Sequence, residues 1–104
     1  MVEVVQIIRI APGRHADFLK RRAAIKSIRE RTGAPQARYM QIMTGANQGA
    51  IAVILTFEDM RSFGDYSQRL RGDPEWRKLR DQTRGDPQPI VTLVDSIITE
   101  TFEE

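Results

Sequence analysis

The sequence predicts an α+β fold in which helices cover one face of a four-stranded antiparallel sheet. Two kinds of segment alternate along the chain: Val- and Ile-rich segments typical of strands, and segments with apolar residues at helical spacing. Glycine and proline mark the boundaries between them. Together these observations predict the order strand, helix, strand, strand, helix, strand.

The first strand is predicted over residues 2–10, VEVVQIIRI, because β-branched residues suit a pleated backbone. Pro12 and Gly13 end it, since proline cannot donate to a strand ladder and glycine permits a turn.

The first helix follows, because apolar residues recur there at helical spacing among lysines and arginines. Gly33 and then Pro35 predict its end. The apolar positions are Phe18, Ala24 or Ile25, and Ile28.

The second and third strands form a predicted hairpin. Residues 36–44 are predicted as a strand in which Ala37, Tyr39, Gln41 and Met43 face one side and Arg38, Met40 and Ile42 the other. Residues 45–49 form a five-residue loop with glycine at both ends. Residues 50–57 are almost entirely apolar. A strand that is apolar on both faces is expected to be buried on both faces.

The second helix is predicted to begin at Glu58-Asp59, since acidic residues suit the positive end of a helix. Gly72 is expected just beyond its end with a positive φ angle. In the stretch RGDPEW, residues 71–76, Asp73 then fits an N-cap and Pro74 the first position of a shorter helical piece. The apolar stripe of the second helix is Met60, Phe63, Tyr66 or Ser67, and Leu70.

The last strand is predicted over residues 90–102, followed by Glu103 and Glu104 as a solvated tail. Two sets of apolar residues are expected on its opposite faces. One set is Ile90, Val94, Ile98 and Phe102, and the other is Val91, Leu93 and Ile97.

This order of elements predicts one ferredoxin-like domain over residues 1–104, with both helices on one sheet face. The other sheet face is also apolar and needs a cover. The simplest cover is a second copy related by a two-fold axis, which would give an eight-stranded dimeric α/β barrel.

Composition excludes several kinds of site. The chain has no cysteine, so disulfides and thiol chemistry are excluded, and its single histidine, His15, cannot form a histidine cluster for a metal. No apolar stretch is long enough for a membrane span, and the N-terminus lacks the pattern of a signal peptide. We therefore expect a cytoplasmic protein without metal or cofactor.

Basic residues are concentrated in the two predicted helical segments. The net charge is only +2, yet 14 of the 16 lysines and arginines lie within residues 14–31 and 61–84. They either form solvated helix faces or a patch that attracts anionic ligands or nucleic acid.

Several motifs, in order, resemble those of NIPSNAP-like proteins. They are Pro12-Gly13 with Phe18-Leu19, the hairpin Gly45-Ala46-Asn47-Gln48, Phe57-Glu58-Asp59, Arg69-Leu70 and Asp73-Pro74-Glu75-Trp76. The resemblance covers most of the chain and implies membership of the dimeric α/β-barrel superfamily, which includes antibiotic-biosynthesis-type and haem-degrading monooxygenases. The strand IAVILTF lacks the aromatic residue often found there in the family. The resemblance therefore implies the fold and the dimer more than any activity.

The resemblance also implies a small-molecule pocket between the sheet and the helices of each subunit. If the Tyr39 face looks toward the helices, Tyr39, Gln41 and Trp76 could line it, because tyrosine and tryptophan offer apolar rings with one polar group each. The alternative is that these side chains only pack in the core. His15 could serve there as a base, or lie at the surface. The haem-degrading members use an Asn, a Trp and a His, but the order His15, Asn47, Trp76 does not match theirs, so no haem site is expected.

The predicted function is that of a homodimeric, NIPSNAP-like protein of unestablished activity that binds a small organic molecule. The alternative is a cofactor-independent monooxygenase acting on an aromatic substrate. An RNA-recognition module shares the topology, but it needs exposed aromatics on its central strands, and the third strand has only Phe57.

Overall fold

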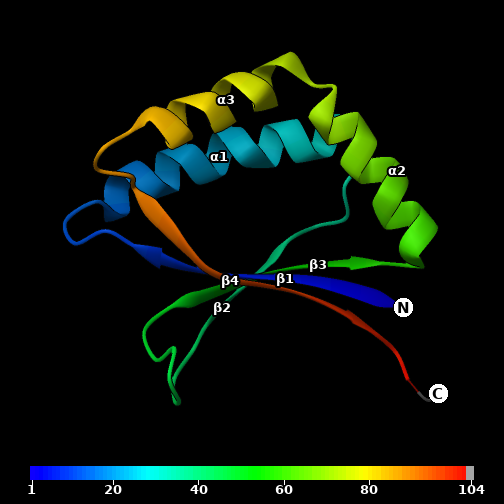
Figure 1. The fold of residues 1–104 in the computed structure, drawn as a ribbon, viewed down its shortest axis with the longest axis horizontal. Helices are drawn as coiled ribbons and strands as arrows, with labels where there is room; N and C mark the ends of the chain where they lie inside the picture. The colour runs from blue at the N-terminus through cyan, green and yellow to red at the C-terminus, as the bar shows by residue number, and fades with distance from the viewer. Residues whose placement is uncertain (103–104) are drawn as a thin grey trace.

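In the computed structural model, which describes residues 1–102, four strands form one antiparallel sheet in the order β2-β3-β1-β4. Three helices lie on one side of this sheet, and α3 runs along the outer side of α1 (Figure 1). The predicted ferredoxin-like fold is thereby confirmed, with the shorter helical piece as a full third helix. The elements are β1 Val2–Ile10, α1 His15–Arg31, β2 Arg38–Gln41, β3 Ile51–Phe57, α2 Met60–Arg71, α3 Pro74–Gly85 and β4 Val91–Glu100.

The core lies between the central strands and the helices. Strand register pairs Val2 with Phe57 and Val4 with Leu55, which places these four side chains on one sheet face. Tyr66 of α2 packs against them to form a buried cluster. Burial of this apolar surface is the main force that holds the helices on the sheet.

The opposite sheet face is uncovered in the single chain. By the same register, Val5 and Ile54 point away from the helices, and both are only half-buried. Met40 on β2 and Ile97 on β4 share that face and are 51% and 41% exposed. Burial of β3 on its second face thus stays a prediction that depends on a covering subunit.

The end of α1 was predicted correctly. Gly33 has a φ angle of +81°, and the N–H of Ala34 donates to the carbonyl of Arg29 at 2.9 Å, as in a glycine-ended helix. Arg69 of α2 donates from Nε to the carbonyl of Thr32 at 2.8 Å, so α2 holds this helix end directly.

The corner between α2 and α3 confirms two predictions and corrects one. The carboxylate of Asp73 accepts the N–H of Trp76 at 3.0 Å, and Pro74 opens α3. The prediction of a positive φ at Gly72 is wrong, because its φ is −81° and α2 ends there in a right-handed turn. Arg31 at the end of α1 pairs with Asp73 at 2.7 Å, which ties α3 to α1.

Two strands differ from their predicted extent. β2 has four residues, because its ladder with β3 runs only from Arg38 to Gln41, and the connection to β3 is longer than five residues. Beyond the ladder, Ile42 and Ala50 still share a backbone hydrogen bond of 2.9 Å.

β4 ends at Glu100 and contains an irregularity opposite Ile7 and Ile8. Asp95 pairs with Ile7, but Leu93 pairs with Ile8, so Val94 is skipped. Leu93 therefore shares a face with Ile98, and the predicted assignment of β4 residues to two faces is wrong at that point. The predicted solvated tail, residues 103–104, lies outside the described residues. Among the described helices, none is long and apolar enough to cross a membrane.

Candidate functional site

Tyr39 points from β2 toward the helices. It pairs with Val53 of β3, which lies on the same buried face as Leu55. Its hydroxyl oxygen accepts a hydrogen bond of 3.2 Å from Nη1 of Arg29. The guanidinium carbon of Arg22 lies 4.2 Å from the centre of its ring, within the range of a cation–π interaction. Two arginines of α1 therefore hold one tyrosine of the sheet.

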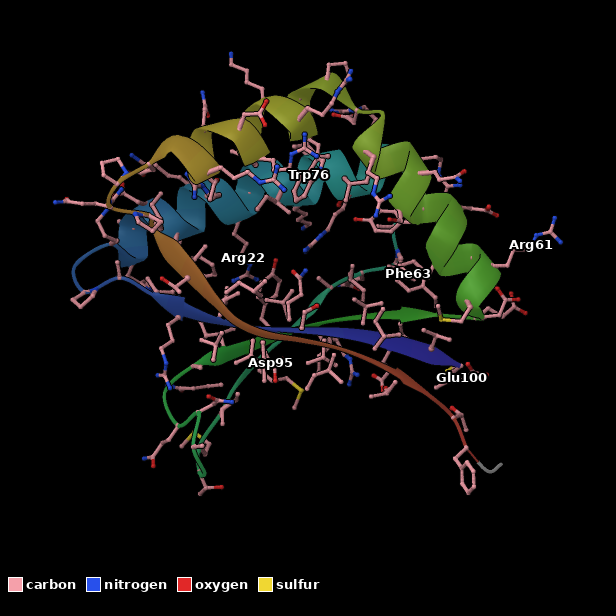
Figure 2. The ribbon with its side chains drawn as sticks, viewed as in Figure 1. Arg22, Arg61, Phe63, Trp76, Asp95 and Glu100 are labelled. Atoms are coloured by element: carbon pink, nitrogen blue, oxygen red, sulfur yellow. The ribbon has the colours of Figure 1, made fainter. Side chains whose placement is uncertain are left out.

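A cleft of about 400 Å³ opens beside this tyrosine, between α1 and β2. It has one wall from α1, one from the connection that follows Gly33, and a base from β2. Figure 2 shows Arg22 extending from α1 into the space above the sheet. The lining residues are Arg22, Lys26, Arg29, Glu30, Ala34, Pro35, Gln36, Ala37 and Tyr39.

The helical wall of the cleft is strongly basic. Arg22, Lys26 and Arg29 lie four and three residues apart, which places them on one face of α1. Among residues 1–102, Glu30 is the only acidic residue in the lining. The wall formed by the connection between α1 and β2 is apolar instead, since Ala34, Pro35 and Ala37 present small apolar groups.

Arg29 also influences Tyr66, which is buried and lies in the middle of α2. Burial raises the pKa of the Tyr66 hydroxyl, and the charge of Arg29, together with a hydrogen bond to it, opposes that rise. The arginine thus lies between a buried phenol and the phenol of the cleft, and the raised pKa keeps Tyr66 protonated at neutral pH.

Of the four residues predicted to line a pocket, the cleft contains Tyr39 alone. Gln41 shares its sheet face two residues further along β2 and is exposed. His15 is the exposed first residue of α1, with its ring 6.3 Å from that of Phe18. Trp76 is half-buried where α3 lies against α1 (Figure 2), with α1 between it and the sheet. The structure does not bring these four residues together.

That separation gives no support to the monooxygenase alternative, which needs a base and aromatic rings around one substrate. Within residues 1–102, no group of three or more histidines, aspartates or glutamates is placed to hold a metal ion.

The basic residues of the cleft were not predicted as site residues. Their signal was present, because Arg22, Lys26 and Arg29 follow the spacing of one helix face. The same spacing is common in solvated helix faces, so only the position of β2 and Tyr39 distinguishes a cleft wall from ordinary surface.

The fold and the cleft define a ferredoxin-like α+β domain with a ligand-sized space between a helix and the sheet. An uncharacterised NIPSNAP domain protein from Burkholderia xenovorans has this fold, with a TM-score of 0.67 and 18% identity over 97% of this chain and 94% of that one. Protein Atu4242 from Agrobacterium tumefaciens gives a TM-score of 0.65 and 19% identity over 96% and 92%.

A third similar structure is a mutant of MhuD with two manganese protoporphyrin IX molecules bound per active site. It gives a TM-score of 0.58 and 12% identity over 100% of this chain and 97% of that chain. At these identities the three proteins share a fold with this chain, which confirms the resemblance to NIPSNAP-like proteins at the level of fold. No protein-family model matches the chain, and no curated protein matches it either.

Proposed function

We propose that this chain is a NIPSNAP-like protein that forms a homodimeric α/β barrel and binds a small organic molecule in the cleft between α1 and β2. The observation that carries the ligand proposal is the cleft of about 400 Å³ beside Tyr39. Ligand sites commonly have volumes of about 300–1,000 Å³ and combine apolar walls with a few polar groups. Here Ala34, Pro35 and Ala37 provide the apolar wall, and Tyr39 provides a ring with a hydroxyl group.

The dimer is supported by the uncovered sheet face. Val5, Ile54 and Ile97 lie side by side across its middle. The edge strand β2 adds Met40 and, opposite Ile54, Arg38, which forms an ion pair of 2.6 Å with Glu3. An apolar centre with a polar border is typical of protein interfaces. A second copy supplies a matching face because two-fold interfaces are self-complementary and sheets stack face to face.

The cytoplasm stays the predicted compartment. A chain without cysteine forms no disulfides, which is usual for proteins of a reducing compartment.

Ligand binding can be tested by following backbone amide signals in NMR spectra while flat aromatic compounds are added. The compounds include neutral 2-naphthamide and its carboxylate analogue 2-naphthoate. We expect shifts at residues 34–39 and at the cleft side of α1, and none in the hairpin at residues 45–49. Tyr39→Ala should weaken binding, whereas Gln88→Ala, an exposed change in the loop before β4, should not. If no compound of the set shifts the cleft signals, the proposed ligand site is wrong.

A further inference from the structure

We infer that the ligand of this cleft is an organic anion, a flat apolar molecule that carries a carboxylate. The inference rests on the proposed function, because it names the ligand class for the same cleft.

The first support is the uncompensated charge of the cleft. The described residues of its lining include three cations and one carboxylate, a difference of two positive charges. Within residues 1–102, none of Arg22, Lys26 and Arg29 pairs with a carboxylate. Several other arginines of the chain do form such pairs, as Arg31 does with Asp73 and Arg38 with Glu3. The cleft cations are therefore free to bind an anion from solution.

The second support is the geometry of donors around Tyr39. Arg29 donates to the Tyr39 oxygen through Nη1 and also interacts with Tyr66, so only its remaining N–H groups are available to a ligand. Because that oxygen accepts, the Tyr39 hydroxyl proton can still be donated to a ligand. Arg22 contacts the ring with its guanidinium group and makes no hydrogen bond to a side chain or carbonyl of residues 1–102. Planar guanidinium groups bind carboxylates through two parallel hydrogen bonds.

The third support comes from the opposite wall. Ala34, Pro35 and Ala37 have no charged side chains, so they contact apolar groups without leaving polar atoms unpaired. A ligand that spans the cleft therefore places its anionic group toward α1 and its apolar ring toward the connection between α1 and β2. An inorganic anion uses only one of these walls.

The test compares 2-naphthoate with neutral 2-naphthamide, which has the same ring system. We expect naphthoate to bind at least about tenfold more tightly, because hydrogen bonds to charged groups are stronger than neutral ones. The preference should decrease in high salt. The double variant Arg22→Gln/Lys26→Gln should remove most of it, whereas Lys20→Gln, an exposed change on the same helix, should leave it unchanged.

The possible outcomes distinguish a wrong ligand site from a wrong ligand class. If neither compound binds, the ligand site itself is wrong. If both bind equally, or if the double variant keeps the preference for naphthoate, the site stands and the inference is overturned. If phosphate alone competes as well as naphthoate, the apolar wall has no role and the inference also fails. Circular dichroism of both variants shows whether the fold is retained.

Discussion

Replacing Gly33 with alanine tests how the fold ends α1 beside the cleft. Gly33 has a φ of +81°, which costs a residue with a Cβ atom about 1–2 kcal/mol. An added Cβ would also lie 3.4 Å from Nη2 of Arg69, whose Nε donates to the carbonyl of Thr32. That distance is an ordinary van der Waals contact with the end of a flexible side chain, so the Arg69 hydrogen bond is kept and adds little to the loss.

The substitution should therefore lower the free energy of unfolding by about 1–2 kcal/mol. With an unfolding entropy of about 2.1 cal/mol/K per residue, the 104 residues convert this loss into a fall in Tm of about 5–9 °C. Urea unfolding followed by circular dichroism measures the change. The protein concentration must be held fixed, because the stability of a dimer depends on it.

Gly64→Ala is the matched control. Gly64 lies within α2 without a positive φ angle, and an added Cβ would meet no atom within 4 Å. The same substitution should therefore stabilise the protein here, by about 0.5–1 kcal/mol, since alanine is the better helix former. If Gly33→Ala is as stable as the wild type, or if both variants shift in the same direction, the reasoning about the helix end is refuted.

Three further predictions concern the core, the helix caps and the cleft. Phe57→Ala should reduce the free energy of unfolding by about 3–5 kcal/mol in urea, because its ring is 5% exposed within the core; a loss under about 1 kcal/mol contradicts this. Hydrogen bonds from Ser62 lower the pKa of Asp59, and the Arg31 hydrogen bond lowers that of Asp73. Their stabilisation is thus present above the ordinary carboxyl pKa and lost as pH falls through the depressed values. Below about pH 4, the Tm of Asp73→Asn should therefore fall less steeply with decreasing pH than the Tm of the wild type. Equal slopes of Tm against pH would contradict the prediction. In a double-mutant cycle, Arg22→Gln and Tyr39→Leu should show a coupling of about 0.5–1 kcal/mol, and additive effects would argue against the cation–π contact.

The order of elements could be predicted because its signals are local. Valine- and isoleucine-rich strands, Gly33 after α1 and the Asp73-Pro74 start of α3 depend on a few neighbouring residues. Gly72 shows the limit of such reasoning. Glycine permits a positive φ but does not require one, and here the tight turn into Asp73 keeps the right-handed conformation.

Features that depend on pairing between distant segments could not be predicted in the same way. The irregularity at Val94 exists only in the ladder of β4 with β1, so alternation along β4 alone assigned the wrong faces. The cleft depends on the same kind of information. Tyr39 was predicted as a candidate, but its contact with Arg22 and Arg29 requires α1 to lie over β2.

The central claim is that the sheet is covered on both faces, by its own helices and by a second copy of the chain. The molar mass in solution, measured by light scattering at micromolar concentration, tests this claim most directly. We predict twice the chain mass of 11.9 kDa for the wild type and for Ala23→Lys, an exposed change on α1. Ile54→Lys, which places a charge on the uncovered face, should give the mass of a single chain with its circular dichroism retained. A wild-type mass of 11.9 kDa would contradict the account.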